Sequence, residues 1–346
     1  MSRFKFTGFL RWSLRVITIL YTCALVVGLL LTHFLAEGFW LTTVSLYSAP
    51  GFWLAPMLLL VPASLFWERR LLLLYPLLVV FLVFFHMRWN PFPGGDPTTA
   101  ELIILSNNVG QRGKTSFRNY EQSIVPDIIL LQEVGGRIYK HERDFPGYHA
   151  AASGEFGILS RHPILLAEPV PGLELPVAAR FRVLFGKEEV ILYNVHLPTP
   201  RRNLQRLRGN GFLHSLASGG GLFSKNVRGE FNEFMDRNLR LAEKIVEAAS
   251  VEDSPVVIAG DFNAPAQGRV ARTMAKAFQD VHLKAGGGCG FTFPGVSRNP
   301  FSLFGPFLRI DHAYANGRLR PVGCRVEPRR PSQHLAVAAG FDLSDL

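Results

Sequence analysis

Six places in the sequence combine a short apolar run with polar side chains of the kinds that can hold a metal ion beside a phosphate group. These side chains are Asn108, Glu133, His196, Asp261 with Asn263, Asp311 and His334. Carboxylate and amide oxygens are the ligands that a hard cation prefers, and an imidazole can carry a proton to or from a reacting group. One polar residue after an apolar run would only start a loop, but this collection indicates metal-assisted hydrolysis of a phosphate ester.

The chemistry of each side chain suggests its role. We expect Glu133, Asp261 and Asn108 to hold Mg²⁺ or Mn²⁺, because such an ion keeps several waters and needs few protein ligands. Asn108, Asn263 and His196 are expected to contact phosphate oxygens. Asp261 with Asn263 would also position the attacking water.

Asp311 and His334 form the predicted acid/base pair, in which the carboxylate orients the imidazole. An isolated Asp–His pair is more often part of an ordinary hydrogen-bonded core, so this assignment depends on the other candidates. His312 follows Asp311 directly and would point to the opposite face of a strand. We therefore exclude His312 from the site.

The elements that must position these side chains are short strands. Their apolar runs are rich in Val, Ile and Leu, which is typical of buried strands. The runs are 102–105, 128–131, 190–193, 256–259 and 308–312. The clearest helix is predicted at 228–249, where apolar residues recur every three or four positions. Together they predict an α/β domain over residues 99–346.

Seven short motifs follow one another in this region. They are Ser106–Val109, Asp127–Glu133, Phe156–Arg161, Asn194–Leu197, Gly260–Asn263, Arg309–His312 and Ser332–Val337. Each is weak alone, but in this order they resemble the motifs of the endonuclease/exonuclease/phosphatase superfamily, which has the deoxyribonuclease I-like fold. The resemblance implies a four-layer α/β sandwich of two mostly antiparallel sheets with the active site at one end. It also implies that Glu133 binds the metal and that Asp311 orients His334.

Two positions depart from the family pattern. Gln333 stands where the family usually has Asp, and Gln can hydrogen-bond but carries no charge. Gly110 stands where many nucleases of the family have Asp. The departure at Gln333 supports an alternative to catalysis, which is a membrane-tethered domain that binds a phosphate ligand without turning it over.

The first quarter of the chain has a different composition. Residues 1–95 hold seven Lys or Arg and two acidic residues, and the whole chain has a net charge of +10. With 48% hydrophobic and only 18% charged residues, the chain is not intrinsically disordered. Three cysteines are too few for a disulfide scaffold, and the sequence leaves open whether Cys289 and Cys324 pair.

The uncharged runs in this first quarter predict a multi-pass membrane anchor over residues 1–89, with spans at 16–36, 50–67 and 71–87. Basic residues precede the first span and lie in the turn 68–70, whereas residues 37–49 contain none. The positive-inside rule then puts the N-terminus in the cytoplasm and, with three spans, the α/β domain outside it. In a bacterium the anchor would lie in the plasma or inner membrane. With only two spans the domain would be cytoplasmic.

Two further segments complete the prediction. Residues 90–98 contain Pro and Gly and are interpreted as a linker. Residues 198–223 are predicted to be a mobile loop, with a second interpretation as a basic flap that meets an anionic substrate or the membrane surface.

The sequence thus predicts a membrane-anchored, metal-dependent phosphoesterase, most simply a phosphodiesterase. Its expected substrate is a phosphate ester, which could be nucleic acid, a phospholipid head group or a small phosphate ester. The lipid bilayer is the other expected partner, with no obligate protein partner. The spans contain no internal acid or base other than histidines near their ends, which argues against a transport function.

Overall fold

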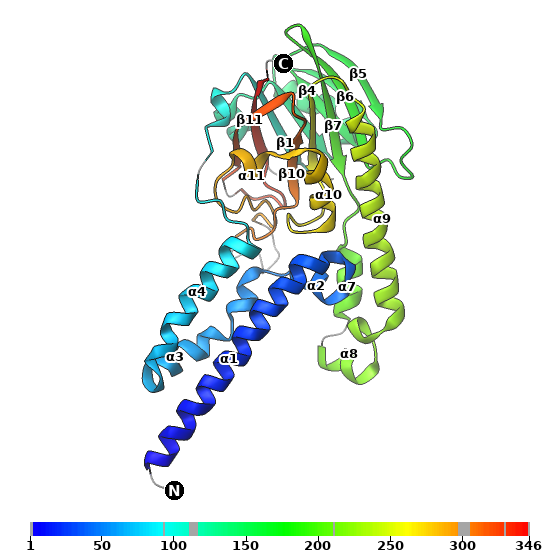
Figure 1. Ribbon diagram of the computed structural model, residues 1–346. Coiled ribbons are helices and arrows are strands. Elements are labelled where there is room, and N and C mark those ends of the chain that lie inside the picture. The colour runs from blue at the N-terminus through cyan, green and yellow to red at the C-terminus, as the bar shows by residue number, and fades with distance from the viewer. Residues whose placement is uncertain are drawn as a thin grey trace. The chain divides into compact units, whose positions relative to one another are not determined.

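The computed structural model describes residues 3–92, 94–110, 117–209, 212–296, 305–328 and 330–344. The chain divides into two compact units, Met1–Trp89 and Asn90–Leu346. The first is helical and the second contains the sheets (Figure 1).

The N-terminal unit consists of apolar helices joined by short turns. Its helices are α1 (Arg3–Leu35), α2 (Trp40–Leu46), α3 (Met57–Trp67) and α4 (Leu74–Phe81), with 3-10 turns at Ala36–Gly38, Pro50–Leu54 and Arg69–Leu73 and a π-helical turn at Leu82–His86. Three stretches, Thr7–Gly38, Pro50–Trp67 and Arg69–His86, are long and apolar enough to cross a membrane. The predicted spans 16–36 and 50–67 lie within the first two stretches, and 71–87 matches the third except for Met87.

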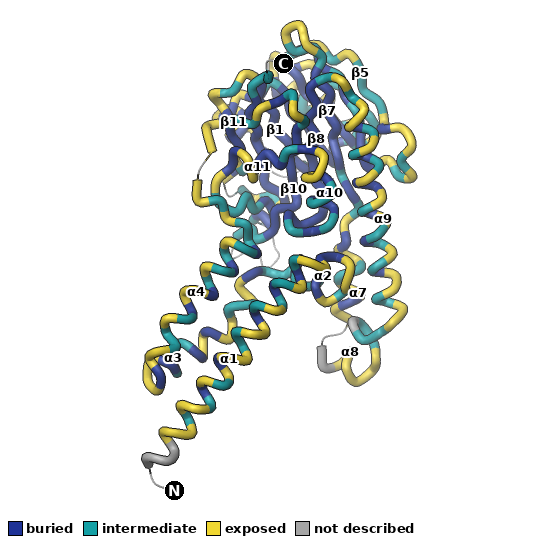
Figure 2. The backbone as a smooth tube through the Cα atoms, viewed as in Figure 1, coloured by how far each residue is buried: buried dark blue, intermediate teal, exposed yellow. Residues whose placement is uncertain are grey.

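Several polar side chains of this unit are buried, including Thr18, Ser64 and Glu68. The Tyr75 hydroxyl lies 2.8 Å from Ser64 Oγ and 3.3 Å from Thr18 Oγ1, and Arg15 Nε donates to Glu68 at 2.8 Å. Some apolar side chains, such as Leu25 and Leu29, form a buried cluster, but many others are exposed, for example Phe66, which is 80% exposed. Figure 2 shows exposed residues along all of these helices. An apolar exterior of this kind suits hydrocarbon surroundings.

The C-terminal unit contains two six-stranded sheets, with strand orders β11-β12-β1-β2-β4-β3 and β5-β6-β7-β8-β10-β9. All neighbouring strands are antiparallel except one pair in each sheet, β1–β2 and β7–β8. The strands are β1 (Leu102–Asn108), β2 (Ile128–Gln132), β3 (His149–Ser153), β4 (Phe156–Ser160), β5 (Ile164–Pro169), β6 (Ala178–Phe185), β7 (Glu188–His196), β8 (Val256–Asp261), β9 (Gln279–Asp280), β10 (Asp311–Ala315), β11 (Leu319–Val326) and β12 (Val337–Leu343).

The helices of this unit are α5 (Arg118–Ile124), α6 (Ile138–Asp144), α7 (Arg201–Arg208), α8 (Phe212–Ser218), α9 (Lys225–Ser250), α10 (Arg269–Ala277) and α11 (Val281–Ala285), and 3-10 turns lie at Pro97–Thr99, Gly135–Arg137 and Gly221–Phe223. Helices α5 and α6 pack on the outer face of the first sheet, and α9 and α10 on that of the second, whereas α7 and α8 lie beyond the sheets (Figure 1). Alternate strand residues such as Leu130 and Leu192 form the core between the sheets. Ile124 and Ile138 pack on the first sheet, and Ile245 on the second. These four layers confirm the predicted α/β sandwich.

Strand direction explains why the predicted site residues meet. The C-terminal ends of the parallel strands β1 and β2, and of β7 and β8, lie at the same edge of their sheets, with His196 opposite Asp261. The antiparallel neighbours β10 and β12 begin at that edge, so Asp311 also lies opposite Asp261 and His334 precedes β12.

Three predictions about local structure need correction. The run 308–312 was expected to be a strand ending at Asp311, but β10 begins there. Residues 198–223 are not simply a loop, because they contain α7, α8 and a 3-10 turn among the residues described. The long helix α9 starts earlier than predicted, where Ser224 caps it by accepting from the Val227 amide.

The segment that connects the two units is attached to the C-terminal unit. Asn90 and Gly288 exchange two backbone hydrogen bonds of 2.9 Å. The Asn90 side chain also donates to the carbonyl of Gly286 at 2.6 Å, and Asp96 forms an ion pair with Arg325 at 2.8 Å. Cys289 and Cys324, both within the described part of the chain, are free thiols.

Candidate active site

Two carboxylates from different sheets converge on one amide. Asn108, at the end of β1, donates through Nδ2 to Glu133 Oε1 at 3.1 Å and to Asp261 Oδ2 at 3.0 Å. The other end of the amide is also held, because the Gly110 backbone amide donates to Asn108 Oδ1 at 2.9 Å. Asp261 is only 1% exposed. The predicted metal ligands Glu133, Asp261 and Asn108 are therefore together at the edge where the strands end.

The backbone at Glu133 has an unusual conformation. Its φ is +58°, in the left-handed region that costs an ordinary residue about 1–2 kcal/mol. Arg137 helps to hold this turn by donating to the carbonyls of Glu133 and Gly110. Non-glycine residues in this region concentrate at functional sites. Here the turn follows β2 directly and accompanies the approach of the Glu133 carboxylate to Asn108.

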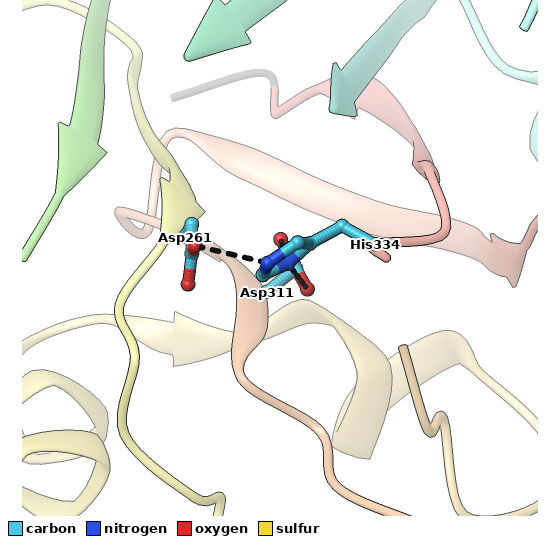
Figure 3. Close-up of side chains that lie close together, drawn as sticks. All are labelled: Asp261, Asp311 and His334. Carbon is cyan, nitrogen blue, oxygen red and sulfur yellow. Dashed lines mark hydrogen bonds and ion pairs between the residues drawn. The ribbon is translucent and has the colours of Figure 1, made fainter. Parts of the chain in front are cut away.

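Asp311 and His334 form a buried pair beside these carboxylates (Figure 3). His334 Nδ1 lies 3.2 and 3.1 Å from the two oxygens of Asp311. Its other nitrogen, Nε2, lies 3.6 Å from Asp261 Oδ2. The amide of Asp311 donates to Thr292 Oγ1 at 3.3 Å, and the ring of Phe293 lies 5.1 Å from that of His334. The imidazole is thus oriented by a carboxylate on one side and faces the acidic site on the other.

His196 approaches the same carboxylates from the end of β7. Its Nε2 lies 3.8 Å from both Glu133 Oε1 and Asp261 Oδ2. Its Nδ1 lies 2.9 Å from Glu155 Oε1. Glu155 therefore orients His196 much as Asp311 orients His334.

The acidic surroundings favour the charged form of both imidazoles. Burial alone would lower the pKa of His334, but the carboxylates of Asp311 and Asp261 outweigh it and raise the pKa to about 9. Burial also opposes the charged form of His196, and its hydrogen bond to Glu155 together with the charge of Asp261 still raises the pKa of this imidazole. Both histidines are therefore suited to stabilise negative charge.

Asn263 lies in the loop directly after β8. Its backbone amide donates to Asp261 Oδ1 at 2.9 Å, and its side-chain Nδ2 donates to the carbonyl of Leu197 at 2.8 Å. It has a positive φ of +48°, which Asn tolerates better than most residues. In the structure Asn263 thus fixes the carboxylate of Asp261 and ties the loop after β8 to the chain that follows His196.

The donor set fits a divalent cation. Asp261, Asp311 and His334 offer ligand atoms within 4.8 Å of one another. This group differs from the predicted set of Glu133, Asp261 and Asn108, and the two share Asp261. Asp311 contacts His334 through both carboxylate oxygens, whereas Glu133 and Asp261 both accept from Asn108. Oxygen donors gathered around the buried carboxylate of Asp261 suit Mg²⁺ or Mn²⁺.

Sequence reasoning missed several residues around the site. Glu155 lies in the turn between β3 and β4 and has no motif of its own, and Thr292 and Arg137 act through hydrogen bonds that no sequence pattern reveals. The exclusion of His312 agrees with the structure. Its Nε2 lies 2.9 Å from the carbonyl of Ala264, and burial lowers the pKa of its imidazole to about 4.

Several solved structures resemble the chain. An endonuclease/exonuclease/phosphatase family protein from Bacteroides thetaiotaomicron is 17% identical, with a TM-score of 0.49 over 71% of this chain and 98% of that one. A mannosyl-6-phosphatase from the same species is 17% identical, with a TM-score of 0.47 over 69% and 99%. A 3'-5' exonuclease from Neisseria meningitidis is 18% identical, with a TM-score of 0.46 over 70% and 100%.

No curated protein sequence matches the chain. The family model is more informative, since it matches residues 105–334 and so spans every candidate site residue. Because this match covers well over half of the chain, the chain belongs to the Endonuclease/Exonuclease/phosphatase family.

Proposed function

We propose that this protein is a membrane-anchored, divalent-metal-dependent phosphodiesterase that hydrolyses its substrate by attack of water. Family membership supports a phosphoester hydrolase, and the metal dependence, the diester preference and the anchor are our proposal. The observation that carries it is the convergence of Glu133 and Asp261 with the Asp311–His334 pair at one edge of the two sheets.

The proposed roles follow from these contacts. A divalent cation held by Glu133 and Asp261, with Asn108 beside them, would offset negative charge on the phosphate group. His196 and His334 donate hydrogen bonds to phosphate oxygens and stabilise the charge that grows on them. Asp261 accepts a hydrogen bond from the attacking water.

Two residues keep this arrangement in place. Asp311 holds Nδ1 of His334, so that Nε2 faces the substrate side. Asn263 holds Asp261 through its backbone amide, and contact of Asn263 with a phosphate oxygen is part of the proposal. A fixed set of donors is effective because it needs little reorganisation during the reaction.

The apolar helices of the N-terminal unit support the membrane part of the proposal. Three stretches are long enough to span, and basic residues cluster before the first and between the second and third. The positive-inside rule then assigns the catalytic unit to the extracytoplasmic side. The bilayer is the proposed partner besides the substrate, which is a nucleic acid or a phospholipid head group.

Hydrolysis assays of the full-length protein in detergent test this proposal. The substrates would be bis-p-nitrophenyl phosphate, plasmid DNA and sphingomyelin, each with Mg²⁺, with Mn²⁺ and with EDTA. We expect turnover that requires the metal and falls by about 10²- to 10⁴-fold in Asp261→Asn and His334→Ala, because each change removes a group that acts on the reacting atoms. The exposed residues Asp253 and His214 provide matched controls, Asp253→Asn and His214→Ala, which should retain activity.

The second candidate is a domain that binds a phosphate ligand without turnover, which the uncharged Gln333 favours. It predicts no hydrolysis by a folded protein, even after Gln333→Asp. Turnover that appears only in Gln333→Asp would mean that the natural Gln333 keeps the site inactive.

A further inference from the structure

Arg201 lies beside the catalytic edge and has a neutral partner. It is the first residue of α7, and its Nη2 donates to Oε1 of Gln333 at 3.3 Å. Gln333 immediately precedes His334 in the sequence. Both side chains are exposed, so this contact lies at the surface next to the buried Asp311–His334 pair.

The backbone that carries Arg201 is fixed to the site. The Leu197 amide donates to the carbonyl of Asp261 at 3.0 Å, and the Leu197 carbonyl accepts from Asn263 at 2.8 Å. Asn238 of α9 then donates to the carbonyl of Pro198 at 2.9 Å. The short connection from β7 to Arg201 is therefore tied to β8, to the loop after it and to α9.

The backbone that carries Gln333 is fixed as well. Its carbonyl accepts from the Gly295 amide at 2.7 Å, and the following Leu335 amide donates to the carbonyl of Thr292 at 3.0 Å. Thr292 is also the residue that binds the amide of Asp311. Arg201 and Gln333 thus occupy defined places relative to the catalytic pair.

Arg201 has no acidic partner among the residues that the structure describes, whereas Arg206 of the same helix pairs with Glu230. The sequence contains no acidic residue between Glu189 and Glu230. An acidic residue in place of Gln333 would sit against the guanidinium and cancel its charge. The amide of Gln333 instead engages Arg201 and leaves its charge available.

We propose that Arg201, oriented by Gln333, forms an anion subsite that receives a second phosphate group of the substrate, next to the phosphate being hydrolysed. This inference rests on the proposed function and narrows its substrate class to phosphate esters with a further phosphate nearby. A guanidinium presents several N–H donors in a plane and pairs well with phosphate oxygens. Gln333 is then part of substrate selection, and its lack of charge is what keeps the subsite cationic.

The test compares two esters that differ in one group. The probes are the p-nitrophenyl ester of thymidylate with and without a second phosphate on its sugar, and full-length protein in detergent is assayed at low and high salt. We expect wild-type protein to prefer the doubly phosphorylated ester, and Arg201→Ala to lose about two- to fivefold of that preference, mainly through KM, since an exposed ion pair contributes modestly. High salt should weaken the wild-type preference.

Three further variants make the test specific. Arg202→Ala removes the same charge from the neighbouring exposed position, and it should keep the preference. Arg201→Lys should restore part of it, because Lys keeps the charge but not the planar donors. Gln333→Asp should lose the preference as Arg201→Ala does, because the new carboxylate pairs with Arg201.

Two results would overturn the inference. One is an unchanged preference in Arg201→Ala, and the other is an equal loss in Arg201→Ala and Arg202→Ala, which would indicate a diffuse basic surface. Both are distinguishable from failure of the proposed function, in which wild-type protein hydrolyses neither ester nor bis-p-nitrophenyl phosphate with any metal.

Discussion

The orientation of His334 depends on one carboxylate. Asp311 binds Nδ1 of the imidazole, and the Thr292 hydroxyl accepts from the Asp311 amide. Asp311→Asn keeps the size of the side chain but removes the charge that favours the imidazolium. We therefore expect kcat for bis-p-nitrophenyl phosphate to fall by about 10²-fold or more. Stopped-time assays of p-nitrophenol release measure this.

The control for this prediction is Asp253→Asn, which removes an exposed charge from the same unit. Circular dichroism should show that both variants are folded. An Asp311→Asn protein that is folded and fully active would refute the proposed role of Asp311 and leave it as an ordinary core residue.

At the scale of the secondary-structure elements, the sequence predicts which side chains the order of the strands brings together. The ends of the parallel pairs β1–β2 and β7–β8 must share an edge, so Asn108, Glu133, His196 and Asp261 could be grouped from their positions after apolar runs. Asp311 was placed at the wrong end of its strand, because an isolated run does not reveal whether a polar residue starts or ends it. It still belongs to the site because β10 is antiparallel to β8.

Other site features depend on contacts between segments far apart in the sequence. Glu155 reaches His196 across the two sheets from a hairpin turn, and Arg201 reaches Gln333 from α7. No periodicity or spacing in the sequence predicts the partner of an acidic residue in a turn or of an arginine at the start of a helix. The helices within residues 198–223 were missed for a related reason, since glycine and arginine there hide the apolar pattern.

One buried ion pair positions the start of β10. Arg309 makes two hydrogen bonds of 2.7 Å to Asp280, and Asp280 also caps α11 by accepting from the Leu283 amide. Asp280→Asn retains a capping oxygen but leaves the Arg309 charge buried and unpaired. We expect unfolding free energy to fall by about 3–5 kcal/mol, measured by urea unfolding with far-ultraviolet circular dichroism.

The matched control is Asp236→Asn, which breaks a partly exposed pair with Arg269 and should cost no more than about 1 kcal/mol. Equal losses of unfolding free energy in the two variants would show that the buried Asp280–Arg309 pair contributes no more to stability than the Asp236–Arg269 pair. All five tryptophans lie in residues 1–89, so tryptophan fluorescence would follow the other unit and is unsuitable here.

The Asp280–Arg309 ion pair also predicts that part of the unfolding free energy is lost at acidic pH. Burial alone would raise the pKa of Asp280, but Arg309 outweighs it and holds the pKa well below its usual value. A depressed pKa gives stability that is present above the unfolded value, about 4, and is lost as the pH falls below it. The stability difference between wild type and Asp280→Asn should therefore shrink as the pH is lowered from neutral to about 3. A difference that stays constant would contradict this linkage.

At the scale of the whole molecule, the uneven distribution of charge predicts topology. Six of the seven Lys and Arg residues in residues 1–95 lie before the predicted span 16–36 or in the turn 68–70, and only Arg88 follows the third stretch. We therefore expect the turn at 69–70 inside the cell and the C-terminal unit outside. One added cysteine at an exposed position, Arg70→Cys or Val251→Cys, can be compared in intact cells with the parent chain and its three native cysteines, using a maleimide that does not cross membranes. Val251→Cys should gain labelling at once, and Arg70→Cys only after permeabilisation. Protection of both positions would mean that only two stretches span and that the substrate is cytoplasmic. Labelling of Arg70→Cys but not Val251→Cys in intact cells would mean that the turn at 69–70 is outside the cell and the C-terminal unit is inside.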